Sequence, residues 1–182
     1  MAAATVTVMK LTTDETQWAD LMAHTKTRVS DPPLAVVLAV AALLDDEKIK
    51  GSWVTFKPAE PEEHSTWAVF VATADRLIHV ELQFDREMYN AHQDSQLRRD
   101  PAKVVASSAR RLRDVSRIEI GACQARLPER GSQDWIGVGK VSLIFKDGER
   151  VDLPFDQLVM DRSEDRDRSD DLLDAIRAGA SI

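Results

Sequence analysis

A concentration of arginine side chains lies in the middle of an otherwise acidic chain. The chain has 182 residues and a formal net charge of −7. Clustered guanidinium groups bind carboxylates and phosphates, so an acidic protein or RNA would be the partner. Such a run is more often a solvated face, and no aromatic side chains are interleaved with it to stack on bases. The candidate binding residues are Arg98, Arg99, Arg110, Arg111, Arg113 and Arg117.

The histidines show no metal-ligand spacing and have no neighbouring cysteines. We therefore expect no metal site, no cofactor and no catalytic residue identifiable from the sequence. The alternative is a small enzyme whose site assembles from dispersed side chains such as His79, Glu81 and Asp85. That alternative predicts a deep pocket that holds groups with perturbed pKa values. The four histidines are His24, His64, His79 and His92.

The segment Gly137–Lys140 is similar to part of a phosphate-binding loop. That motif needs a glycine five residues before its Gly-Lys pair and a serine or threonine after the lysine. Here Asp134 and Val141 occupy these positions. The segment also leads toward a strand rather than a helix, so we interpret it as the start of a strand.

Alternating aspartate and serine residues from Asp161 to Ser169 have the spacing of calcium-loop ligands. Arg166 replaces the turn glycine, and Leu172 stands where the bidentate glutamate belongs. Three interspersed arginines further neutralise the segment. We therefore expect a solvated linker over 156–168 rather than a calcium site.

The composition is that of one ordinary globular domain, with 43% apolar and 30% charged residues. A single cysteine, Cys123, excludes an intramolecular disulfide and favours a reducing compartment. The longest apolar run, Leu34–Leu44, is much shorter than the roughly 20 residues of a membrane span. The first nine residues lack the basic region of a signal peptide. These features predict a cytoplasmic protein, and its acidity argues against general nucleic-acid binding.

Two helices are expected at the beginning of the chain. Thr12 and Glu15 have capping-box spacing, and apolar residues at helical intervals predict a helix over 13–28. Asp31 is the expected N-cap of a second helix, Leu34–Leu44, which is apolar all round and must be buried.

The rest of the chain predicts about seven antiparallel strands. Ala74-Asp75 and Asp147-Gly148 have hairpin spacing. Residues 101–112 fit a helix, whereas 109–115 equally fit a short strand. Ser169 is the expected N-cap of a last helix with a buried stripe of Leu172, Leu173 and Ile176. The expected strands are Ile49–Lys57, Trp67–Thr73, Arg76–Phe84, Ser116–Leu127, Val138–Lys146 and Glu149–Phe155.

Hairpins followed by one C-terminal amphipathic helix resemble the bacterial pleckstrin-homology-like (PH-like) domains. The resemblance rests on the order of four segments that cover about 44–178. It implies an α+β fold with a helical leader over 1–45 and, over 46–182, an antiparallel PH-like β-barrel with a C-terminal capping helix. The segments are Leu44–Ile49, Val71–Ile78, Leu112–Ile118 and Ile144–Glu149.

The resemblance also implies a non-catalytic binding module, because such domains bind lipids, peptides or proteins and are not enzymes as a class. Three glutamates between Lys57 and His64 would repel an anionic lipid headgroup. We therefore expect a protein partner rather than peripheral membrane contact. The apolar helix in the leader would also provide a surface for a homo-oligomer if the barrel leaves it uncovered.

Overall fold

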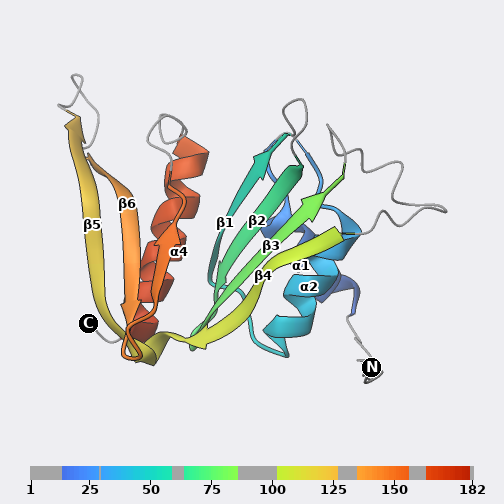
Figure 1. Ribbon diagram of the computed structural model, residues 1–182, viewed down its shortest axis with the longest axis horizontal. Helices are drawn as coiled ribbons and strands as arrows, with labels where there is room; N and C mark the ends of the chain where they lie inside the picture. Colours follow the sequence, from blue (N-terminus) through green and yellow to red (C-terminus); the bar gives the residue numbers. More distant parts are fainter. Residues whose placement is uncertain are drawn as a thin grey trace, which may run out of the picture.

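The computed structural model describes residues 14–28, 30–58, 64–85, 102–126, 135–155 and 163–180, and in this part the chain is an α+β fold. Among these residues three α-helices accompany two antiparallel sheets (Figure 1). The elements, in chain order, are α1 (Glu15–Thr25), α2 (Leu34–Leu44), β1 (Gly51–Lys57), β2 (Ser65–Ala72), β3 (Arg76–Phe84), β4 (Ala102–Arg111), the 3₁₀ turn η1 (Leu112–Asp114), β5 (Val115–Arg126), β6 (Trp135–Phe145), β7 (Arg150–Leu153) and α4 (Ser163–Ala180).

The two sheets are separate. The first has the strand order β1-β2-β3-β4 and the second β5-β6-β7, and no strand pairing joins them within the described residues. The expectation of a closed barrel is therefore wrong. The physical reason lies at η1, where the chain turns between β4 and β5 and buries Leu112 completely. Because the two strands diverge from this corner, each keeps one edge that no described strand pairs with (Figure 1).

The four-stranded sheet is covered on both faces, and each face has its own core. Strand β3 shows why, because its side chains alternate between the two sides. Ile78 and Val80 pack with α1 and α2, whereas Leu77 packs with α4 and the second sheet. The strand expected over Arg76–Phe84 is confirmed, and the apolar residues on the helix side, Ile78, Val80, Leu82 and Phe84, are all buried.

One face of helix α2 is buried by the chain itself. Val36, Val37 and Val40 are fully buried against the four-stranded sheet, whereas Leu34, Leu38 and Leu43 are partly exposed. A homo-oligomer through this segment stays a prediction. Within the described residues no helix is both long and apolar enough to cross a membrane.

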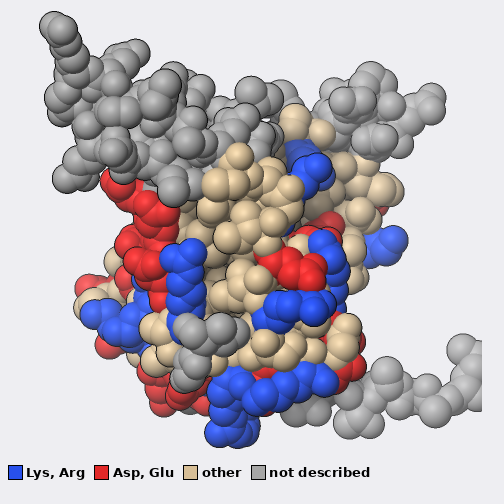
Figure 2. All heavy atoms as spheres, turned by 90° about the vertical axis from the view of Figure 1, so that its left-hand side faces the viewer, with Lys and Arg blue, Asp and Glu red and all other residues tan. Residues whose placement is uncertain are grey.

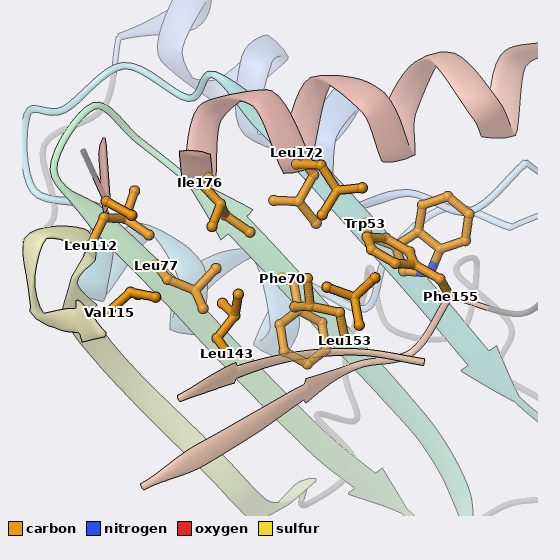
Figure 3. Packing of buried hydrophobic residues seen from close by; sticks show 14 of the residues in the cluster. Trp53, Phe70, Leu77, Leu112, Val115, Leu143, Leu153, Phe155, Leu172 and Ile176 are labelled. Atoms are coloured by element: carbon orange, nitrogen blue, oxygen red, sulfur yellow. The ribbon is translucent and has the colours of Figure 1, made fainter. Parts of the chain in front are cut away.

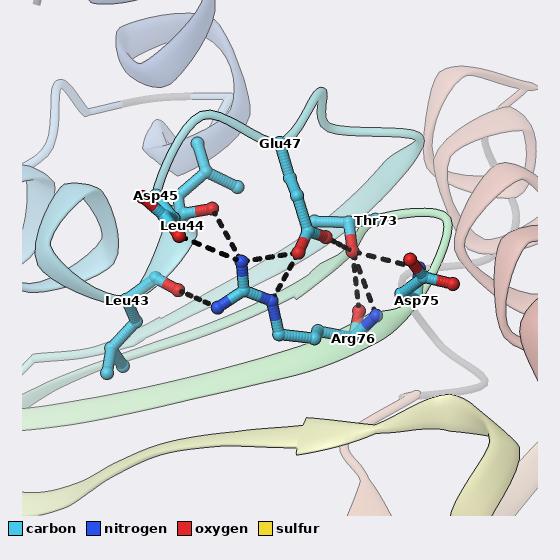
Figure 4. Close-up of polar contacts among 7 residues, drawn as sticks. All are labelled: Leu43, Leu44, Asp45, Glu47, Thr73, Asp75 and Arg76. Atoms are coloured by element: carbon cyan, nitrogen blue, oxygen red, sulfur yellow. Dashed lines mark hydrogen bonds and ion pairs between the residues drawn. The ribbon is translucent and has the colours of Figure 1, made fainter.

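Arg76 fastens the end of α2 to the turn between β2 and β3 (Figure 4). Its guanidinium group donates to the carbonyl oxygens of Leu43 and Leu44, each at 3.3 Å. These oxygens accept no hydrogen bond within the helix, so the guanidinium cation caps the helix. The cation also interacts favourably with the negative end of the helix dipole. The same guanidinium group is paired with Glu47, which also accepts a hydrogen bond from Thr73.

Helix α4 lies against β1 and closes the core between the two sheets (Figure 3). The predicted stripe of Leu172, Leu173 and Ile176 is confirmed as buried. The helix begins at Ser163, however, so the expected linker over 156–168 is wrong for 163–168, and Ser169 is a buried helical residue rather than the N-cap. A helix also cannot form the calcium-type loop.

Several other local predictions are corrected. Asp14, not Thr12, caps α1, because its carboxylate accepts from the Gln17 backbone amide at 2.7 Å while Gln17 bonds back in a capping box. Pro33 stands at the N-cap of α2 in place of Asp31. The helical alternative for 101–112 is wrong, since this segment is β4. Thr12 and the segment 86–101 lie outside the described residues.

The close approach of α4 to β1 depends on Gly51. A Cβ atom there would lie 2.6 Å from the backbone of Asp171 and from the Cα atom of Leu172. Because these backbone atoms of α4 leave no room for a Cβ atom, Gly51→Ala should lower the free energy of unfolding by roughly 2–3 kcal/mol. Denaturant titration would measure this loss.

Gly148→Ala is a control variant for which we expect a smaller loss of stability. Its added Cβ would have no atom within 4 Å, so only the strain of φ +86° remains, with an expected loss of about 1 kcal/mol. Equal losses in the two variants would show that α4 moves away from β1 without penalty, contrary to the packing described above.

Candidate functional site

The structure places Arg110 among acidic side chains rather than on an open basic face. Its guanidinium group pairs with Asp147 at 3.1 Å and with Glu149. It also lies over the ring of Phe145, 4.7 Å from the ring centroid. Arg110 therefore joins β4 to the β6–β7 hairpin, and its charge is already compensated.

Of the other described members of the predicted arginine cluster, only Arg111 lines the same pocket as Arg110. Arg117 pairs with Glu119 at 2.8 Å. Arg111 and Arg113 form no salt bridge with a described residue. Arg98 and Arg99 lie outside the described residues, so they add no geometry. Arg110 and Arg117 are thus neutralised by neighbouring carboxylates, whereas Arg111 and Arg113 are not paired with any described carboxylate.

A shallow pocket of about 440 Å³ lies beside Arg110. Its charged lining consists of Arg110, Arg111 and Lys146 together with Asp114 and Asp147. Lys146 donates to the backbone oxygen of Arg113 at 2.7 Å and lies 3.7 Å from Asp114. Cations and anions are therefore mixed around this pocket, and it does not concentrate positive charge for an anion.

Charge reversal at neighbouring residues separates a structural role from a binding role. Arg110→Glu should lower the free energy of unfolding by roughly 1–2 kcal/mol, because it sets three carboxylates together and removes the cation–π contact. Arg111→Glu should change it by less than about 0.5 kcal/mol. Thermal denaturation of both variants measures the difference, and a larger effect at Arg111 would contradict this assignment.

His24 takes part in a serine–histidine–aspartate arrangement that sequence spacing did not reveal. Its Nδ1 atom lies 2.9 Å from Ser52 Oγ, and its Nε2 atom lies 3.6 Å from Asp20. Such a set resembles a hydrolase triad. Ser52 is only 4% exposed, however, and the described pocket lies elsewhere. A nucleophile must reach its substrate, so we assign these contacts to the packing of α1 on β1.

Of the dispersed residues of the enzyme alternative, His79 and Glu81 lie close together, whereas Asp85 pairs elsewhere. His79 stacks on Phe70, with ring centroids 4.2 Å apart, and lies 3.9 Å from Glu81. Asp85 instead pairs with His64 at 2.7 Å, and both of these side chains are exposed. The described residues hold no group of three or more potential metal ligands.

The two partly buried histidines predict the direction of a pH effect. Burial lowers the pKa of His24 despite the opposing charge of Asp20, and burial likewise lowers the pKa of His79 despite Glu81. The unfolded chain therefore binds more protons just below pH 6.5, where an ordinary histidine titrates. Stability should be present above that pH and should be lost as the pH falls.

We expect the free energy of unfolding to be smaller at about pH 5.5 than at about pH 7.5. Denaturant titrations at the two pH values measure this difference, and the double variant His24→Gln/His79→Gln should show a smaller one. A wild-type protein that becomes more stable on acidification over this range would contradict the prediction.

The large exposed apolar side chains lie on two of the strands that end a sheet. Among the described residues these side chains are Val104, Val105 and Ile120, at 59%, 47% and 49% exposure. The first two belong to β4 and the third to β5, and each of these strands is one of the two terminal strands of its sheet. A strand edge offers backbone N–H and C=O groups to another chain. These edges therefore form a second candidate site.

The β4 edge carries an irregularity at its valines. Ala106 lies opposite Glu81 and Val104 opposite Leu82, so Val105 is an extra residue in a bulge. In the helical alternative for 101–112, Val104 and Val105 would share one stripe with Leu112, whereas the structure buries Leu112 and exposes both valines. Two adjacent valines in an uncharged stretch are a signal for a strand, but only the structure shows that they are exposed.

Comparison of the chain with protein-family models, with curated proteins and with solved structures found no match. The candidate site therefore has to be interpreted from its own geometry.

Proposed function

We propose that the protein is a non-catalytic binding module that takes up a partner protein at the free strand edge of β4. The observation that carries this proposal is the position of the exposed valines, Val104 and Val105, on a terminal strand. Backbone groups of the edge supply hydrogen bonds to an extended segment of the partner, and the valines supply apolar contact.

We also propose a finer assignment of the fold, as a variant of the PH-like architecture. The PH-like resemblance implied about seven antiparallel strands followed by a C-terminal helix, and the antiparallel strands that precede α4 in the chain support this assignment. We infer an open variant of that architecture, preceded by helices that pack on the four-stranded sheet. Binding without catalysis is the usual role of such domains.

The geometry gives less support to the alternatives. An anion or nucleic-acid site needs uncompensated cations, whereas Arg110 and Arg117 are paired with carboxylates. An enzyme site needs an accessible nucleophile or base within a pocket, whereas Ser52 is buried. The mixed charges around the shallow pocket favour neither alternative.

Val104→Lys tests the proposal. The protein would be used to capture partners from its native cells, and the captured protein would then be purified and its direct affinity measured by calorimetry. A lysine at this position removes apolar contact and places an unpaired cation in the interface. We expect the affinity to fall by roughly tenfold or more.

Ser107→Lys is the matched control, because Ser107 is exposed on the same strand and receives the same charge. Equal losses of affinity in the two variants would indicate a general charge effect, and unchanged binding by Val104→Lys would place the partner elsewhere. Either result would overturn the proposed site.

A further inference from the structure

The free edge of β5 differs from that of β4 in its regularity. From Arg117 to Arg126 the paired residues of β5 keep one constant register with β6, with one interruption at Gly121, next to Lys140 with its φ of +52°. The register itself shifts only at the beginning of the strand, between Val115 and Arg117. Within the described residues no strand pairs with the outer edge of β5. A long regular edge of this kind is a template for one more strand.

An apolar row continues along β5 from the core to this exposed edge. Ile118 lies opposite the buried Leu143, and Ile120 lies opposite the buried Val141, so both isoleucines point to the core side of the sheet. Ile118 packs against the core, whereas Ile120 is 49% exposed.

The surface beside the free edge of β5 is suited to contact with an uncharged strand. Figure 2 shows it with β5 toward the viewer, and a broad uncharged region runs through its middle between charged groups on either side. The charged side chains of this part of β5, Arg117 and Glu119, point to the opposite face of the sheet and pair with each other at 2.8 Å. Charge therefore does not block the approach of an apolar strand.

We propose that β5 pairs with β5 of a second copy of this chain, antiparallel, about a two-fold axis at Ile120. Antiparallel strands related by such an axis present the same surface to each other, as an isologous dimer requires. The pairing joins the two three-stranded sheets into one continuous sheet and removes both free β5 edges. It does not depend on the partner proposed for β4.

The residues of β5 are self-complementary in this register. Ile120 lies opposite the partner subunit's Ile120, and Ile118 lies opposite the partner subunit's Ala122, so the apolar row continues across the axis. On the other face, Glu119 lies opposite the partner's Gly121 and Arg117 opposite the partner's Cys123. Directly opposed side chains interact most strongly in a sheet, and here no like charges are opposed.

Neighbouring registers are less favourable. An axis at Glu119 would set two carboxylates directly against each other, which destabilises a strand pair. An axis at Ile118 would place Ile120 opposite a serine, Ser116 of the partner subunit, and so leave its apolar surface without an apolar contact. Burial of Ile120 against its own copy therefore selects the axis at Ile120.

The mass in solution tests the dimer directly. Sedimentation equilibrium of the full chain should give twice the chain mass of 20.3 kDa at high protein concentration. Ile120→Lys would place two ammonium groups opposite each other at the axis. The dissociation constant of the dimer should therefore rise about tenfold or more. Because Ile120 is half exposed, the variant should keep the circular dichroism spectrum and melting behaviour of a folded chain.

Val105→Lys is the matched control, since Val105 has nearly the same exposure on the other free edge. It should leave the self-association unchanged. A chain that stays monomeric at every concentration would overturn the proposal. So would a dimer that survives Ile120→Lys, or one that Val105→Lys weakens equally.

Cross-linking tests the register independently of any folding defect. In a Cys123→Ser background, Ile120→Cys should form an intermolecular disulfide on mild oxidation, because directly opposed Cα atoms lie within disulfide range. Cys123 itself should not cross-link to its copy, since it lies opposite the partner's Arg117. A disulfide through Cys123, or none through residue 120, would overturn this register.

Discussion

The close contact between α4 and β1 at Gly51 is the constraint on which the rest of the structure depends. It brings Leu172 and Ile176 onto the inner face of the four-stranded sheet, where the three-stranded sheet also packs. Gly179 makes a second close approach at the other end of the helix, against Leu112 in the corner between the sheets. One helix therefore holds two sheets that share no backbone pairing within the described residues, and this arrangement leaves the edges of β4 and β5 open.

The sequence predicted elements well where the periodicity of side chains was strong. The alternation in β3, the Asp147-Gly148 turn and the stripe around Leu172 all follow from local patterns. Prediction from the sequence failed where the periodicity of side chains was weak. Strand β4 contains small residues that suit a helix as well, and its pairing with β3 is a long-range contact that local propensity does not encode. The missing closure of the barrel depends on the corner at Leu112, which has no local signature.

The candidate site was less predictable than the fold, because its character depends on distant partners. The arginine run suggested an anion site, but Asp147 lies 37 residues from Arg110 and reaches it only through the fold. Similarly, Val104 and Ile120 become exposed only because their strands end the two sheets. Sequence spacing identifies which side chains have suitable chemistry, whereas the folded topology decides which of them are already neutralised and which remain accessible.

The position of two tryptophans on opposite faces of one sheet has a practical consequence for optical spectroscopy. Trp53 lies in the core with α4, in edge-to-face contact with Phe155, and its buried indole N–H has no acceptor among the described residues. Trp67 lies fully buried on the face of α1, and its indole N–H donates to the carbonyl oxygen of Thr25. In variants that keep one of the four tryptophans, the fluorescence of Trp53 would report solvent reaching the first face and that of Trp67 solvent reaching the second. The chain carries intrinsic probes that distinguish partial from complete unfolding without an added label.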